Sequence, residues 1–119
     1  MNATVDNPVV LLIHYRRTVR ELILSTLSSD PKDRARVREI PVFDEENGQF
    51  MLVLVGWYGQ VPVHHCPIHV EIADGKIVLL RDETGRNLKK QLLAAGVRPG
   101  DLLDKTTPAP YGQPGSQPA

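Results

Sequence analysis

The stretch from Ile40 to Arg81 constrains the fold most, because apolar and polar residues alternate along it and three turn signals divide it. Asn47-Gly48 and Asp74-Gly75 suit type I′ turns, which need a positive φ at both central residues, and Tyr58-Gly59-Gln60 supplies the turn between them. Each signal separates two neighbouring segments, so the pattern predicts an antiparallel meander. The four expected strands cover residues 40–44, 49–57, 61–73 and 76–81.

The second expected strand, QFMLVLVGW, is apolar at almost every position. A strand with one face in water would alternate, so this pattern is typical of a central strand that is covered on both sides. Helices or a second copy of the chain can supply the cover. Because 119 residues can build only a modest core, we expect a homodimer or a hetero-complex.

A helix is expected on each side of the strands. Asn7 can accept backbone N–H groups at a helix start, the proline after it has no N–H to lose, and apolar residues recur at helical spacing through residues 8–27. Thr84 can cap a second helix over residues 84–95, which Gly96 would end in a left-handed conformation. The predicted fold class is therefore α+β: an N-terminal helix, a four-stranded antiparallel meander and a second helix packed on the sheet.

The composition, 41% hydrophobic and 24% charged residues, is that of an ordinary globular protein. Fourteen Lys plus Arg balance fourteen Asp plus Glu, so no whole-molecule field attracts the chain to nucleic acid or to an anionic membrane. The longest apolar run, residues 9–13, is too short to span a membrane, and the N-terminus does not read as a secretory leader, so we expect a cytoplasmic protein. Residues 1–105 should form a single domain, and the Pro- and Gly-rich residues 106–119 a disordered tail.

The segment VHHCPIHV, residues 63–70, holds three of the four histidines and the single cysteine. Side chains alternate along a strand, so His65, His69 and Glu71 are expected on one face and Cys66 on the other. The two histidines would lie about 13 Å apart, too far to share one zinc ion, and no metal site, cofactor or catalytic residue is predicted. Cys66 should pack as a small core residue, and the histidines should face a partner or solvent.

Residues 32–38, KDRARVR, form the most basic segment and are expected to be a solvated linker. Its four cations, Lys32, Arg34, Arg36 and Arg38, are candidates for contacts with phosphate or with an acidic partner.

Trp57 and Tyr58 end the second expected strand, just before a tight turn. Trp57 can pack under the sheet, or the two aromatic residues can form a hot spot for a partner, since Trp and Tyr dominate interface energetics. Both interpretations stay open. Gly56, beside them, indicates a bulge or a close backbone approach.

Several short motifs together resemble the XisI-like family of fdxN element excision controlling factors. The similarity covers about residues 14–103 and includes a VGW strand end, a C-x-IHV-x-I strand, a DGKI turn and a D-x-T before a helix. The chain departs from the family at Gly85, where glutamate is usual, and after Leu103. The matching positions are Val55-Gly56-Trp57, Cys66, Ile68-His69-Val70, Ile72, Asp74-Gly75-Lys76-Ile77, Asp82, Thr84, Gly96-Val97 and Asp101-Leu102.

The resemblance implies a non-enzymatic controlling factor that acts with a XisH-like partner of nuclease fold in site-specific excision of a DNA element. A site-specific recombinase complex is a further candidate partner, and a neutralising role in a toxin–antitoxin-like pair is an equivalent interpretation. The candidate partner-binding residues are Trp57, Tyr58, His65, His69 and Glu71.

Alternatives from other classes stay open. One is a small metal- or Cys/His-dependent enzyme centred on residues 64–69, or a two-metal site built from the acids at 44–46 and 82–83. Another is a direct DNA-binding protein, which zero net charge counts against. It would use Arg16, Arg17 and Arg20 together with residues 32–38.

Overall fold

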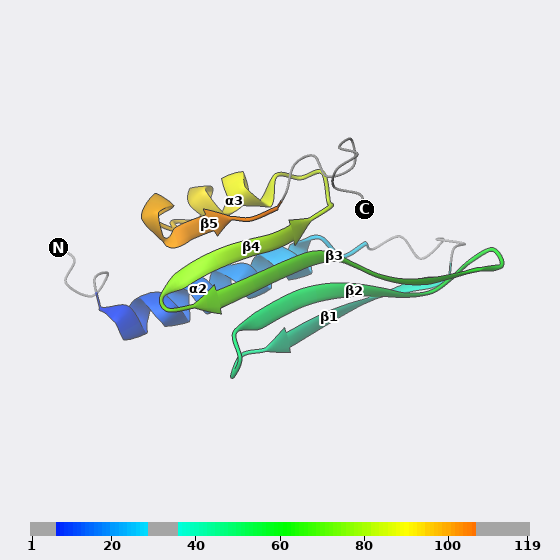
Figure 1. Cartoon of the computed structure of the whole chain (residues 1–119), viewed down its shortest axis with the longest axis horizontal. Coiled ribbons are helices and arrows are strands. Elements are labelled where there is room, and N and C mark those ends of the chain that lie inside the picture. Colours follow the sequence, from blue (N-terminus) through cyan, green and yellow to red (C-terminus); the bar gives the residue numbers. More distant parts are fainter. Residues whose placement is uncertain (1–6, 29–35, 107–119) are drawn as a thin grey trace, which may run out of the picture.

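The computed structural model describes residues 7–28 and 36–106. Within them lie two α-helices, one short 3-10 helix and a five-stranded sheet, which confirms the α+β class (Figure 1). The predicted tail, residues 106–119, falls outside the described residues apart from Thr106. No helix among the described residues is long and apolar enough to cross a membrane.

The N-terminal helix, α2 (Pro8–Ser25), starts as its sequence predicts. The Asn7 side chain accepts hydrogen bonds from the backbone N–H groups of Val9 and Val10, at 2.8 and 3.3 Å. Four-residue spacing then places Tyr15, Val19 and Ile23 on one buried stripe. The helix ends two residues earlier than the predicted boundary, which is within the usual fraying of helix ends.

The sheet has the order β1-β2-β3-β4-β5. The first four strands form the predicted antiparallel meander. β5 pairs in parallel with β4 and was not predicted, because three residues are too few to show a period. The strands are β1 (Val37–Asp44), β2 (Gln49–Tyr58), β3 (Val61–Ala73), β4 (Lys76–Asp82) and β5 (Leu102–Asp104).

Two of the three turns follow the prediction closely. Asp74 and Gly75 both have positive φ, 54° and 75°, as a type I′ turn requires. Gly59 and Gln60 form the two-residue turn between β2 and β3, since Tyr58 pairs with Val61.

The predicted type I′ turn at Asn47-Gly48 is wrong. Asp44 pairs with Gln49, which leaves a four-residue loop between β1 and β2. The Asp44 carboxylate accepts hydrogen bonds from the backbone and side-chain amides of Asn47, so local bonding favours the longer loop. Gly48 alone has a positive φ, 67°, and its backbone lies against Ile72, where a Cβ would come within 2.2 Å of the carbonyl oxygen.

The second helix, α3 (Leu88–Ala94), begins three residues later than predicted, because its cap is Asn87 and not Thr84. Asn87 caps it by accepting from the Lys90 N–H, while the Thr84 hydroxyl donates to the Asp82 carboxylate instead. Asp82 accepts also from the backbone N–H of Thr84 and of Leu88, so this carboxylate holds the turn between β4 and α3. Gly96 has a φ of 103°, and the left-handed helix end predicted there is confirmed.

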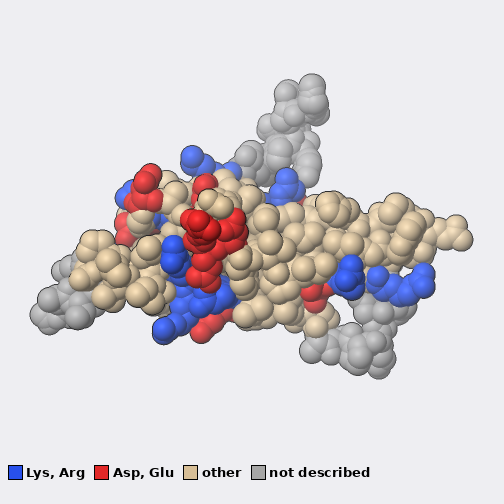
Figure 2. All heavy atoms as spheres, turned by 90° about the horizontal axis from the view of Figure 1, so that it is seen from below, with Lys and Arg blue, Asp and Glu red and all other residues tan. Residues whose placement is uncertain are grey.

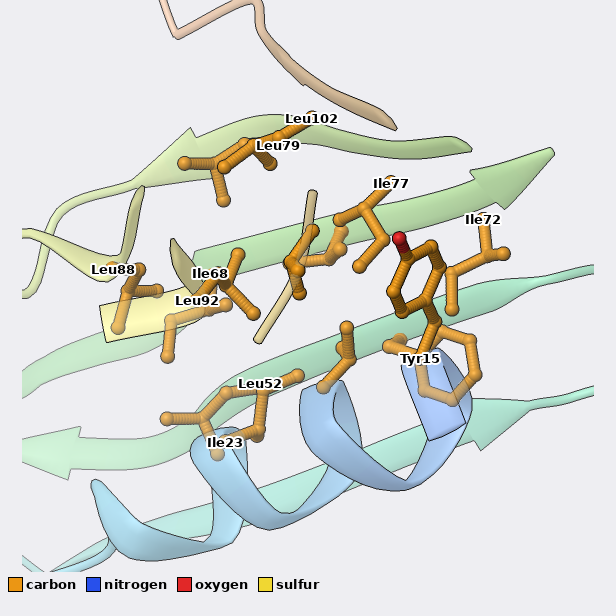
Figure 3. Packing of buried hydrophobic residues seen from close by; sticks show 14 residues of the cluster. Tyr15, Ile23, Leu52, Ile68, Ile72, Ile77, Leu79, Leu88, Leu92 and Leu102 are labelled. Carbon is orange, nitrogen blue, oxygen red and sulfur yellow. The ribbon is translucent and has the colours of Figure 1, made fainter. Parts of the chain in front are cut away.

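The core lies between one face of the sheet and the two helices. Figure 3 shows its side chains pointing toward one another from α2, α3 and the strands. A 3-10 helix (Pro99–Asp101) closes one end, where the Tyr15 hydroxyl donates to Asp101 at 2.7 Å. Both helices pack on this face, and none of the described helices covers the other face (Figure 1). The expectation that β2 is covered by helices therefore holds for one of its two faces. The labelled core residues are Tyr15, Ile23, Leu52, Ile68, Ile72, Ile77, Leu79, Leu88, Leu92 and Leu102.

Candidate protein-interaction surface

The sheet face opposite the helices, here called the open face, is set by the register of β1, β2 and β3. Cross-strand partners share a face, and Phe50 and Leu52 of β2 are buried on the helix side, so the alternate residues of β2 point the other way. The middle of the open face holds Ile40, Val42, Met51, Val53, Val55 and His69, with Arg38 and His64 at one end and Asp44, Gln49 and Glu71 at the other.

The apolar middle of the open face is only half-buried. Met51, Val53 and Val55 are each partly exposed. Phe50 and Leu52, which alternate with them along β2 and point to the helix side, are 0% and 4% exposed. β-branched and aliphatic side chains in the centre of a sheet, left partly in water by the described residues, are typical of a surface that another protein covers.

His69 and Glu71, two of the predicted partner-binding residues, are brought together on the open face. The His69 Nε2 lies 2.7 Å from the Gln49 Oε1, and the Gln49 Nε2 donates to Glu71 at 3.1 Å. Because the amide oxygen can only accept, this arrangement assigns a proton to the His69 Nε2. Gln49 was not singled out from the sequence, since its role appears only once the register of β2 against β3 is known.

The hairpin between β2 and β3 extends beyond the helices, and its tip consists of Trp57, Tyr58 and Val61 (Figure 1). These side chains are 49%, 67% and 61% exposed, so Trp57 does not pack under the sheet. An open hollow at the tip is lined by Arg36, Trp57, Gly59 and Gln60.

Gly56 makes the base of this hairpin possible. Its φ is 150°, and a Cβ there would lie 2.3 Å from the Arg36 carbonyl oxygen, so the predicted close backbone approach is confirmed. Only glycine allows the start of β1 to run this near to β2.

His65 lies on the other face from the one predicted. Leu52 pairs with Ile68 and Leu54 with His65, so β3 carries one extra residue, a bulge, between these pairs. The bulge reverses the alternation and turns His65 to the helix side, away from His69. The sequence signal was Pro67, because proline inside a sheet occurs at edges and bulges.

The Glu83 carboxylate pairs with His65 in this position. The His65 Nε2 lies 2.5 Å from the Glu83 Oε1, and Arg81 donates to the other oxygen at 2.6 Å. The pKa of Glu83 is lowered, mainly by the hydrogen bond from His65 and to a smaller extent by the one from Arg81. These three exposed side chains tie the end of β4 to β3, where the Glu83 N–H also donates to the Pro67 carbonyl.

Cys66 is half-buried at the bulge rather than fully inside the core. Its Sγ–H donates to the Ile68 carbonyl oxygen, and burial raises the pKa of the thiol. Such a cysteine stays protonated near neutral pH and is a poor nucleophile. The described residues contain no group of three or more His, Cys, Asp or Glu side chains that could hold a metal ion.

The basic segment is only partly described. Lys32 and Arg34 fall outside the described residues. Arg36 and Arg38 are exposed, and Arg38 belongs to β1 rather than to the predicted linker. Of the helix arginines, Arg20 forms an ion pair with Glu45.

Charged side chains of both signs gather together over the end of the molecule away from the hairpin, as Figure 2 shows. Toward the hairpin the charged side chains are fewer and mainly basic in this view, with uncharged surface between them. A phosphate backbone needs a continuous basic stripe, and the face in this view does not show one.

Comparison with known proteins decides the family. The model of the XisI protein family matches residues 11–105, which include most of α2 and the whole sheet. This chain belongs to the XisI family. The resemblance found in its motifs is thereby confirmed.

Two crystal structures of XisI proteins from Anabaena variabilis share the fold. A XisI-like protein is 33% identical with a TM-score of 0.74, and the match covers 84% of this chain and 90% of that one. The fdxN element excision controlling factor XisI is 27% identical with a TM-score of 0.67, and the match covers 80% of this chain and 86% of the other. No curated protein sequence matches the chain.

Proposed function

We propose that this XisI-family chain is a non-enzymatic controlling factor that regulates excision of a DNA element by binding a XisH-like protein of nuclease fold. The family assignment and the similarity to an fdxN element excision controlling factor support the regulatory role. The partner is inferred from the family resemblance, and a protein-binding role fits the surface.

The exposed hairpin tip carries the protein-binding part of the proposal. Trp and Tyr side chains most often dominate binding energy, and here Trp57 and Tyr58 are exposed beside a hollow that Arg36 also lines. Arg36 and Trp57 both line this hollow, and a cation and an aromatic ring suit an acidic or aromatic side chain of a partner. The tip is therefore the proposed contact with the XisH-like protein.

The residues that could have formed a catalytic site are poorly placed for catalysis. His64 and His65 point to opposite faces, the thiol of Cys66 has a raised pKa, and the predicted acidic cluster is divided among separate turns. Asp44 bonds to Asn47 and Asp82 to Thr84, so both carboxylates have structural partners.

Co-expression of the tagged chain with the XisH-like protein of the same genome tests the proposal. Affinity capture followed by light scattering should give a complex of fixed stoichiometry. The double substitution Trp57→Ala and Tyr58→Ala should weaken the complex at least ~30-fold, since even one buried aromatic anchor contributes about 2 kcal/mol or more.

The matched control is Ile13→Ala, which removes a 51%-exposed apolar side chain from the outer face of α2. It should leave the affinity unchanged. A double variant that binds as tightly as the natural chain would remove the tip from the proposal, and no complex at all would remove the partner. Excision frequency of the DNA element in cells carrying the double variant then tests the regulatory step.

A further inference from the structure

The open face has a second property, an ordered distribution of charge along β1, β2 and β3; on the neighbouring β4, Arg81 is level with His69 and forms an ion pair with Glu83. Arg38 and His64 are level with Val55, at the hairpin end of the face. Asp44 and Glu71 are level with Gln49, at the opposite end. The level of Leu52 lies three residues from each of these ends, so the cationic and anionic ends are equally distant from it.

The area of the open face suits a protein interface. β2 contains 10 residues, so at ~3.3 Å per residue it is about 33 Å long. Four strands spaced ~4.8 Å apart give a width of about 19 Å and a plan area of about 600 Å² before side-chain relief is counted. A standard interface buries about 800 Å² per partner.

A second copy of this chain can cover the open face in two isologous ways. A two-fold axis parallel to the strands would bring Asp44 of one copy to the level of Glu71 of the other, and like charges would meet. A two-fold axis that crosses the strands at the level of Leu52 reverses the strand direction. It places Arg38 opposite Asp44 of the second copy and His64 opposite Glu71.

The crossing axis also matches the apolar residues. Ile40 then faces Val42 of the second copy, and Val53 faces Met51. Two sheets packed in this manner, about 10 Å apart, form a sandwich whose inner layers are both aliphatic. Charge and apolar pattern therefore select the same arrangement.

We propose that the open face is the interface of a homodimer whose two-fold axis crosses the strands at the level of Leu52. The dimer buries the half-exposed side of β2, and the hairpin tips stay outside its centre. Its formation needs only this chain and does not depend on the XisH-like partner.

Light scattering of the purified full chain over a wide range of concentration is the first test. The expected mass is twice the 13.2 kDa of one chain. The substitution Val53→Asp should give a monomer, because it buries an unpaired charge in the interface. Its control, Ile13→Asp on the exposed face of α2, should stay dimeric. A monomeric natural chain, or a dimeric Val53→Asp variant that keeps its circular dichroism spectrum, overturns the proposal.

A charge swap tests the orientation and does not depend on Val53→Asp folding. Arg38 and Asp44 are both exposed, so Arg38→Glu and Asp44→Lys should fold, and the circular dichroism spectrum checks that Asp44→Lys tolerates the loss of its two bonds from Asn47. Each variant alone places like charges together and should weaken its own dimer at least ~10-fold. An equimolar mixture should form a heterodimer as stable as the natural dimer, because the introduced glutamate then faces the introduced lysine, and the second pair keeps its natural arginine and aspartate. Failure of the mixture to recover overturns the crossing axis.

Discussion

The two faces of β2 differ although they are built from alternate residues of one strand. Phe50 and Leu52 are almost completely buried under α2 and α3, whereas Met51 and Val53 are only half-buried. The apolar pattern of the sequence is the same on both sides. Both faces of β2 carry the apolar pattern that predicts a covered strand, and the two described helices cover only one of them.

The helix-covered face stabilises the monomer and the open face is available for association. The described residues cover one face of the five-stranded sheet with two helices and leave the second apolar face partly in water. Substitutions on the two faces of β2, at the base of the hairpin and in the turn after β4 test this contrast.

The largest expected effect is that of a core truncation. Leu52→Ala should lower the free energy of unfolding by about 2–5 kcal/mol, because it leaves a cavity in a buried layer. Val53→Ala, one residue away on the open face, should cost about 1 kcal/mol at concentrations too low for the proposed dimer to form. Urea denaturation of both variants at several protein concentrations measures the difference. Equal costs at all concentrations would contradict the contrast between the faces.

The next effect tests the base of the hairpin. Gly56→Ala should cost about 2–3 kcal/mol, because a Cβ at this φ meets the Arg36 carbonyl and strains the backbone. Gly59→Ala is the control, since its φ of 66° is also positive but no atom lies within 4 Å of the added Cβ. It should cost only about 1 kcal/mol. Comparable losses in both variants would show that backbone conformation, and not the close approach of β1, makes Gly56 necessary.

Asp82 tests the connection between the sheet and α3. Asp82→Ala removes three hydrogen bonds, from the Thr84 amide and hydroxyl and from the Leu88 amide, and should cost about 1–2 kcal/mol. Asp104→Ala is a matched control, because this carboxylate accepts the same two bonds from Thr106 but holds no helix. It should change the free energy of unfolding by less than ~0.5 kcal/mol. Similar losses would mean that the local turn, and not the helix start, is what Asp82 stabilises.

Much of the architecture follows from local chemistry that sequence makes visible. The Asn7 cap, the meander and the Asp74-Gly75 turn each depend on residues within a few positions, and all three are confirmed. The start of α3 was placed wrongly because Thr84 and Asn87 are both good caps, and the choice between them depends on the bonds that Asp82 makes.

The candidate surface was harder to predict because it depends on register. A single extra residue in β3 turns His65 away from His69, and no local pattern fixes where the bulge falls. The partners of these histidines, Glu83 and Gln49, lie on neighbouring strands and become visible only when the strands are paired. The family motifs could still be recognised, because they identify the strands by their sequence and do not depend on which face each side chain occupies.

The smallest expected effect tests the side chain that the bulge moves. Hydrogen bonds from His65 and Arg81 lower the pKa of Glu83 in the folded chain below its ordinary value of 4.5. The folded state therefore gains stability above that value and loses it as the pH falls through the lower folded pKa. Both side chains of the His65–Glu83 pair are more than a third exposed, so the gain should be a few tenths of a kcal/mol, about the size of a surface ion pair. Glu83→Gln should flatten the dependence of the urea midpoint on pH as the pH falls below 4.5, whereas Glu46→Gln in the exposed β1–β2 loop should not. If both variants follow the natural curve, the bulge places His65 near Glu83 without energetic consequence, and its role is to shape the open face.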